Sequence, residues 1–266
     1  MGGKILRRAE KDISGKINRA KKIIFFLDYD GTLVPIQKKP SLARLDKNTR
    51  ELLKRLSKKS WAKVFIISGR SLKDIKNLVG LKALYYIGNH GIELEGPGIR
   101  YINPKARRLR RAIQKSYIAL KKNLRVKGAL IENKTYTLSL HYRLVSPARI
   151  PGLVKIFNET VKNIKKSKKV KITEGKKVFE IRPDAKWDKG AMTCWILKKK
   201  SLKKYLPICI GDDKTDEDAF RILRNRGITI LVSRKKKKTA AQYRLKSPKE
   251  VVRFLTVIAS PLRGSQ

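Results

Sequence analysis

One stretch near the start of the chain changes abruptly from apolar to acidic. Residues 23–27 read Ile-Ile-Phe-Phe-Leu, and Asp28-Tyr29-Asp30-Gly31-Thr32 follow at once. A short unbroken run of β-branched and aromatic residues is typical of a strand buried on both faces, as in a parallel sheet covered by helices. Because strand side chains alternate, Asp28 and Asp30 point the same way at the carboxyl end of this strand. The stretch predicts an α/β fold with two neighbouring carboxylates at the edge of a parallel sheet.

Two neighbouring carboxylates repel each other, so a fold that keeps them needs a metal ion or a shared proton. A second acidic group lies far downstream, at Gly211-Asp212-Asp213-Lys214-Thr215-Asp216-Glu217-Asp218. The chain has only 21 acidic residues, and seven of them lie in these two places. All-oxygen ligands favour Mg²⁺, while the spacing of the second group does not fit a calcium-binding EF-hand. The acids therefore predict one shared Mg²⁺ site.

The charge balance is strongly basic. Lys and Arg number 67, and the formal net charge is +46. The densest basic runs are Lys165–Lys171, Lys198–Lys204 and Arg234–Lys238, and none is interleaved with aromatic residues as a base-stacking surface would be. We interpret these runs as solvated faces, and a protein that binds nucleic acid or another polyanion stays as an alternative.

The sequence predicts neither a secretory signal nor a membrane-spanning segment. The basic N-terminal segment has no apolar core region, and no apolar run approaches the length that spans a bilayer. Cys194 and Cys209 are too few for a disulfide framework. We expect a soluble, cytoplasmic monomer with no membrane partner.

Strands and helices alternate through the first part of the chain. A buried-type strand over 62–67 ends in Ser68-Gly69-Arg70, and Ser71 is placed to cap the next helix. A further strand over 83–87 ends in Gly88-Asn89-His90-Gly91. A hydroxyl and a glycine at a strand-to-helix turn present backbone N–H groups that suit a phosphate.

The order changes near Pro104. Residues 104–185 predict helix, two strands, helix and two strands, which is typical of an inserted α+β domain with an antiparallel sheet. From Trp187 the alternation resumes, with a strand over 206–210 that delivers the second acidic group and with Thr215 as a helix cap. The sequence thus predicts a core domain made of 1–103 and 186–266.

The motifs at these strand ends resemble a known superfamily. The segments Asp28-Tyr29-Asp30-Gly31-Thr32, Ser68-Gly69-Arg70, Lys189 and Gly211-Asp212-Asp213 resemble, in order, the four motifs of the haloacid dehalogenase superfamily. The closer resemblance, from residue 22 onward, is to the trehalose-6-phosphate phosphatase family. It rests on Gly88-Asn89-His90-Gly91, His141-Tyr142-Arg143, Glu180-Ile181-Arg182-Pro183 and Trp187-Asp188-Lys189-Gly190. Sucrose-phosphate and mannosylglycerate-phosphate phosphatases share the architecture and remain alternatives.

This resemblance implies a Rossmann-like core with a C2-type cap that hydrolyses trehalose 6-phosphate with Mg²⁺. Asp28 would form an aspartyl-phosphate, Asp30 would act as acid and base, and Ser68 and Lys189 would hold the phosphoryl oxygens. The implied metal ligands are Asp28, the carbonyl of Asp30, Asp212 and Asp213. Asp216 either orients these groups or is only a helix N-terminal acid.

The resemblance also implies residues that contact the substrate. In the core these are Thr32, Gly69, Arg70, Asn89 and His90, although His90 has an equally simple structural role at a tight turn. In the cap, the candidates for grasping sugar hydroxyls are Glu132, Lys134, His141, Arg143, Lys176 and Glu180. Each cap candidate could instead be a surface residue on an exposed sheet face.

Overall fold

The structure is a computed structural model that describes residues 12–37, 40–166, 170–175, 177–184 and 187–260, apart from the side chains of 163, 165 and 166. The chain divides into two compact units. One unit is made of Met1–Arg100 and Asp188–Gln266, and the other is Tyr101–Trp187.

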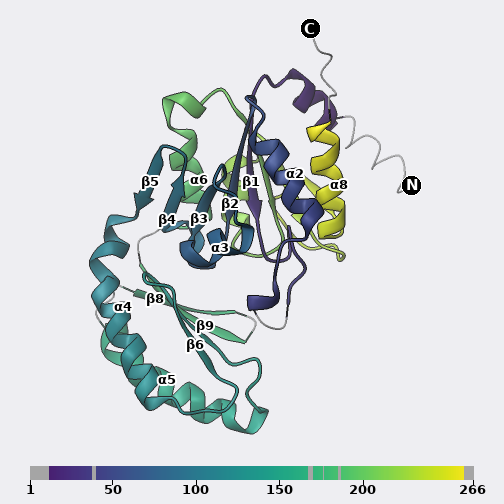
Figure 1. The fold of residues 1–266 in the computed structure, drawn as a ribbon. Helices are drawn as coiled ribbons and strands as arrows, with labels where there is room; N and C mark the ends of the chain where they lie inside the picture. Colours follow the sequence, from purple (N-terminus) through teal and green to yellow (C-terminus); the bar gives the residue numbers. More distant parts are fainter. Residues whose placement is uncertain (1–11, 38–39, 167–169, 176, 185–186, 261–266) are drawn as a thin grey trace. The chain divides into compact units, whose positions relative to one another are not determined.

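The first unit is built on a mostly parallel sheet. Its strands, within the described residues, lie in the order β12-β11-β10-β1-β2-β3-β4-β5, of which Figure 1 labels β1 to β5. Strands β12 to β3 are parallel, and β4 is antiparallel to β3. The bounds are β1 Ile23–Asp28, β2 Ala62–Ile67, β3 Tyr85–Gly88, β4 Glu93–Gly96, β5 Ile99–Ile102, β10 Leu206–Gly211, β11 Ile228–Val232 and β12 Tyr243–Leu245. The predicted α/β fold with a parallel sheet is confirmed.

Local sequence sets where the helices of this unit begin. The helices are α2 Lys47–Ser57, α3 Leu72–Val79, α6 Lys189–Leu197, α7 Glu217–Leu223 and α8 Pro248–Ala259. Asp46 caps α2 and Ser71 caps α3, each through a side-chain oxygen that accepts a backbone N–H. Helices α2 and α8 lie side by side (Figure 1) and bury Leu52 and Leu255 in one cluster with Phe25 of β1. Residues 12–19 are also helical.

The prediction that Thr215 caps a helix is wrong. Helix α7 begins at Glu217, with Asp216 in the cap position. The backbone N–H and hydroxyl of Thr215 donate to Oδ1 of Asp213 at 2.7 and 2.6 Å instead. This local Asp–Thr turn delays the start of the helix because short polar side chains compete with helical hydrogen bonding.

Strand register brings the polar strand ends to one edge of the sheet. Asp28 pairs with Ile67, and Ser68 comes next along the chain. Leu27 pairs with Ile210, so Gly211 and Asp212 follow on the other side of β1. The carboxyl ends of parallel strands are where sites form in open α/β sheets.

The second unit is an antiparallel sheet covered by two helices. Its described strands lie in the order β6-β7-β9-β8, with bounds β6 Leu130–Asn133, β7 Leu138–His141, β8 Val170–Gly175 and β9 Val178–Pro183. Helices α4 Pro104–Asn123 and α5 Ile150–Lys166, the latter preceded by the short η3 Pro147–Arg149, bury Ile113 and Phe157 against Leu138 and Ile181. Because side chains alternate along a strand, Ser139 and Glu180 lie on the sheet face that does not pack against these helices. Across the described part of the chain, no helix combines the length and the apolar character needed to span a bilayer.

Candidate active site

Lys189 forms the centre of a buried ionic group in the first unit. Its Nζ lies 2.6 Å from Oδ1 of Asp28 and 2.7 Å from Oδ1 of Asp216, and all three side chains are at most 8% exposed. Helix α6 starts at Lys189 because Asp188 accepts the N–H of Ala191. Burial alone would lower the pKa of Lys189, but Asp216 and Asp28 outweigh it and raise that pKa well above its usual value. The side chain is therefore a fixed cation between two carboxylates.

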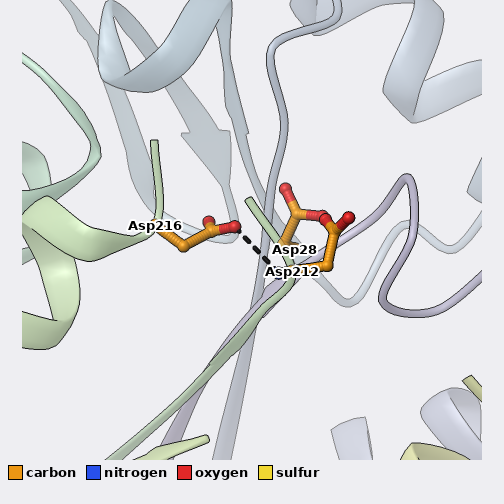
Figure 2. A group of neighbouring side chains, drawn as sticks. All are labelled: Asp28, Asp212 and Asp216. Atoms are coloured by element: carbon orange, nitrogen blue, oxygen red, sulfur yellow. Dashed lines mark hydrogen bonds between the residues drawn. The ribbon is translucent and has the colours of Figure 1, made fainter. Parts of the chain in front are cut away.

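Three carboxylates converge beside this cation. Oxygens of Asp28, Asp212 and Asp216 lie within 4.8 Å of one another. Figure 2 shows the carboxylates of Asp28 and Asp212 next to each other, with Asp216 hydrogen-bonded to the backbone of Asp212. Burial raises the pKa of Asp28 well above its usual value, although Lys189 opposes the shift. Burial and the neighbouring Asp213 raise the pKa of Asp212 to about 7. One ammonium group does not offset this much negative charge.

The free oxygens of this group fit a divalent cation. Among the described residues, Oδ2 of Asp28 is buried and accepts no hydrogen bond. Gly31, with φ +94°, allows Asp212 to approach, since a Cβ on Gly31 would lie 2.3 Å from a carboxylate oxygen of Asp212. Oxygen-only donors with two carboxylates match the preferences of Mg²⁺. Asp28 and Asp212 are the side chains best placed to hold such an ion.

Asp216 and Asp213 have different surroundings. Both oxygens of Asp216 are engaged, one by Lys189 and the other by the backbone N–H groups of Asp212 and Asp213 at 3.1 Å each. Asp213 is exposed, and its carboxylate turns toward Thr215. Partial desolvation opposes ionisation of Asp213, but Lys189 and Thr215 lower its pKa to about 2. The structure thus brings Asp216, rather than Asp213, into the carboxylate group, and there Asp216 orients the residues around it.

Asp30 and Arg70 form a two-point ion pair. Nε and Nη2 of Arg70 each lie 2.7 Å from a different oxygen of Asp30. The backbone N–H of Arg70 donates to Oγ of Ser68 at 3.1 Å, so Ser68 is held in the turn that follows β2. Burial opposes the charged form of Arg70, but the bonds to Asp30 and Asp74 raise its pKa above the usual value. This guanidinium is occupied by protein carboxylates.

The turn after β3 is tied to the turn after β2. The backbone N–H groups of Asn89 and His90 donate to the carbonyls of Arg70 and Ser68 at 2.7 and 3.0 Å. Asn89 and His90 have positive φ values of +51° and +56°, a strained backbone that concentrates at functional sites. The amide of Asn89 donates to the buried Glu93. The turn is therefore held from both sides.

Two further predicted core residues lie close to these turns. Gly69 faces the His90 ring so closely that a Cβ would lie 2.4 Å from it. Thr32, in the turn that follows β1, is fully buried, and its Oγ1 makes no hydrogen bond among the described residues. Any side chain larger than that of Gly69 would displace the imidazole.

A polar cluster lies on the face of the second unit's sheet opposite its two helices, and Lys134 and Ser139 in it are buried. Lys134 lies 3.3 Å from Glu180 and 3.8 Å from Glu132, and His141 lies 3.0 Å from Glu132. Arg143 is exposed after β7, and Lys176 lies outside the described residues. The predicted residues Glu132, Lys134, His141 and Glu180 are thus brought together.

Sequence reasoning missed two members of this cluster. Ser139 donates to Glu180 at 3.1 Å, and Arg182 binds the other oxygen of Glu180 at 2.8 Å. The alternating run 136–142 places Ser139 on the same sheet face as His141, which could have identified Ser139. Arg182 shares a face with Glu180 by the same rule.

Comparison with known proteins identifies similar sequences. The family model described as trehalose-phosphatase matches residues 26–249. Trehalose-phosphate phosphatase B of Arabidopsis thaliana is 37% identical over 252 residues, covering 89% of this chain and 66% of the relative. Probable trehalose-phosphate phosphatase 4 of Oryza sativa subsp. japonica is 40% identical over 261 residues, covering 92% of this chain and 68% of the relative.

The fold agrees with a solved structure as well. The crystal structure of a trehalose-6-phosphate phosphatase related protein superposes with a TM-score of 0.77 at 25% identity, covering 89% of this chain and 96% of the other. The predicted haloacid dehalogenase fold is confirmed by this likeness. Because the family model spans most of the sequence and both relatives exceed 30% identity, the chain belongs to the trehalose-phosphatase family.

Proposed function

We propose that this chain is a Mg²⁺-dependent phosphatase that hydrolyses trehalose 6-phosphate to trehalose and inorganic phosphate through an aspartyl-phosphate on Asp28. The proposal rests mainly on one observation. In a chain of this family, Lys189 holds Asp28 at 2.6 Å within a buried carboxylate group at the carboxyl ends of parallel strands. The chain spans about two thirds of the length of these relatives.

In the first half-reaction, an oxygen of Asp28 attacks phosphorus and the bond from phosphorus to the sugar oxygen breaks. Lys189 fixes the Asp28 carboxylate and offsets part of the negative charge that an incoming phosphate adds. Asp30 supplies a proton to the departing sugar oxygen, because an alkoxide is a poor leaving group. The products of this step are free sugar and a phosphorylated Asp28.

In the second half-reaction, water attacks the phosphorus of the aspartyl-phosphate. Asp30, now a carboxylate, takes a proton from this water. The bond between phosphorus and Asp28 breaks, so that inorganic phosphate leaves and both carboxyl groups return to their starting states. Ser68, held by the turn after β2, would contact phosphoryl oxygens.

Asp28, Asp212 and the carbonyl of Asp30 would hold the Mg²⁺ ion, and Asp216 orients this group through Lys189 and the backbone of Asp212. When bound, the ion supplies positive charge that offsets repulsion between the carboxylates and the phosphate. We propose that the second unit acts as a cap whose cluster around Glu180 grasps sugar hydroxyls. Such a cap would close over the sugar and exclude bulk water while the phosphoryl group is transferred to Asp28.

A panel of phosphate esters tests the function directly. Phosphate release is measured from trehalose 6-phosphate, sucrose 6-phosphate, a mannosylglycerate phosphate and glucose 6-phosphate, with Mg²⁺ and with a chelator. We expect the largest kcat/KM on trehalose 6-phosphate and loss of turnover with the chelator. Acid quenching of the working enzyme followed by peptide mass analysis should show phosphate on Asp28.

Each part of the proposal can fail separately. A higher kcat/KM on another glycosyl phosphate would replace the substrate and keep the mechanism. No turnover of any ester would exclude a phosphatase. Turnover that persists in Asp28→Asn would exclude the aspartyl-phosphate.

A further inference from the structure

The guanidinium of Arg70 is enclosed by groups of the protein itself. Nε and Nη2 bind the two oxygens of Asp30 at 2.7 Å, and Nη2 also donates to the carbonyl of Pro40 at 2.9 Å. Nη1 donates to Asp74 at 2.8 Å. The guanidinium carbon lies 5.7 Å from the centre of the Tyr29 ring. Four of the five N–H donors of a guanidinium are used by these contacts.

These contacts leave Arg70 little capacity to bind substrate. The side chain is 9% exposed, and the oxygens that it contacts belong to the protein. A bidentate guanidinium–carboxylate pair fixes the plane of the carboxylate as well as its position. Such a pair uses only part of the lone-pair capacity of Asp30, whose side chain is 35% exposed on its other side. Arg70 therefore fixes the orientation of the Asp30 carboxylate and leaves its exposed side accessible to a substrate.

We propose that Arg70 is a positioning residue that acts through Asp30. In this proposal, Asp74 and the carbonyl of Pro40 hold the Arg70 guanidinium in place by accepting its other N–H groups. The inference rests on the proposed function, in which Asp30 handles the proton of the leaving oxygen. It replaces the substrate contact that the sequence suggests for Arg70. The role needs the planar fork of arginine, because a lysine ammonium is a point charge that cannot fix a carboxylate plane.

The first test separates positioning from substrate binding. Arg70→Ala should lower kcat on trehalose 6-phosphate by about 10²-fold with little change in KM, since a misplaced catalytic group costs about this much. Arg70→Lys should lose nearly as much. Guanidinium ion should restore part of the kcat of Arg70→Ala, and methylammonium should not. Arg50→Ala is the matched control, because exposed Arg50 also donates to a carbonyl, that of Gly80, away from the site.

The second test asks whether Arg70 acts through Asp30. In single turnover, release of p-nitrophenolate from p-nitrophenyl phosphate needs no proton donor, so Arg70→Ala should leave that step nearly unchanged. Asp30→Asn combined with Arg70→Ala should be no slower on the sugar phosphate than Asp30→Asn alone. Asp74→Asn keeps the Arg70–Asp30 contact but weakens the contact that holds Arg70 in place, so this variant should lower kcat several-fold.

Three results would overturn the inference while the proposed function stands. These are a raised KM with unchanged kcat in Arg70→Ala, equal loss of the sugar and aryl first steps, and full additivity of the two substitutions. If the unaltered protein prefers another glycosyl phosphate, the same tests apply with that ester. If it hydrolyses no phosphate ester, the proposed function fails and this inference fails with it.

Discussion

The ammonium group of Lys189 lies 2.6 Å from the carboxylate of Asp28, although 161 positions separate the two residues in the chain. Asp28 ends β1, and Lys189 begins α6, after the whole second unit has intervened. The same ammonium lies 2.7 Å from Asp216. This contact joins the two segments that make up the first unit, and it places a fixed positive charge beside the proposed nucleophile.

Asp28→Asn tests the proposed nucleophile. An amide does not attack phosphorus as a carboxylate does, so kcat on trehalose 6-phosphate should fall by about 10⁶-fold, as for loss of other catalytic nucleophiles. Lys189 keeps its bond to Asp216, so the thermal midpoint should stay close to that of the unaltered protein. Phosphate release and calorimetry measure the two quantities. Substantial residual turnover would remove Asp28 from the mechanism.

Lys189→Ala should destabilise the fold as well as stop turnover. It leaves Asp28 and Asp216 buried without their cation, and breaking a buried ion pair by removing one partner costs about 3–5 kcal/mol. Urea unfolding measures the change. Lys198→Ala, at an exposed position just after the same helix, is the control and should change stability by less than about 0.5 kcal/mol. Similar stabilities for the two variants would contradict the buried pairing.

Mg²⁺ should stabilise the protein more strongly as the pH rises. The pKa of Asp212 in the folded protein is about 7, above its usual value of 3.8, so folding favours the protonated form of this group. The contribution of protonated Asp212 to the free energy of unfolding is complete below about pH 4 and is lost as the pH rises through about 7. Mg²⁺ binds the ionised carboxylate and offsets that loss.

Thermal unfolding with a chelator and with Mg²⁺ checks this expectation between about pH 5 and pH 8. The difference in midpoint between the two conditions should grow with pH. In Asp212→Asn this growth should be much smaller. An equal Mg²⁺ effect at both ends of the range would argue against Asp212 as a ligand.

Gly31→Ala should impair the metal site more than the fold. Gly31 and Gly98 both have positive φ, +94° and +69°, but only at Gly31 does an added Cβ meet Asp212. Each substitution should cost about 1–2 kcal/mol for the left-handed backbone. Gly31→Ala should also raise the Mg²⁺ concentration that gives half-maximal turnover, whereas Gly98→Ala should not. Titration of activity with Mg²⁺ compares them, and matching curves would contradict the close approach.

Glu180→Gln tests the sugar-binding role of the second unit. Glu180 receives Lys134, Ser139 and Arg182, so its charge organises the cluster. Loss of a charged hydrogen bond should raise KM for trehalose 6-phosphate by about 10–100-fold. Hydrolysis of p-nitrophenyl phosphate, which lacks the sugar, should be unchanged. Glu174→Gln, on β8 of the same sheet and bonded to Tyr142, is the control; an equal rise in KM there would remove the special role of Glu180.

Local sequence was enough to predict much of the fold. The apolar run over 23–27 and the cap residue Ser71 each depend on neighbours a few residues away. Hydrophobic periodicity and capping chemistry record such short-range information directly. β12 was missed because its three residues, Tyr243–Leu245, are too few to show a period.

The sequence by itself determined which residues lie at the strand ends: Asp28 is the last residue of a buried strand, and Ser68, Asn89 and Asp212 each follow a buried strand of the same parallel sheet. Only the tertiary structure decided how their side chains are used. It turned Asp216 toward Lys189 and Asp213 toward Thr215, and it enclosed Arg70 between Asp30 and Asp74. The physical reason is that these choices depend on the distances between segments that are remote in the chain. Packing of the whole unit sets those distances, and no local pattern records them.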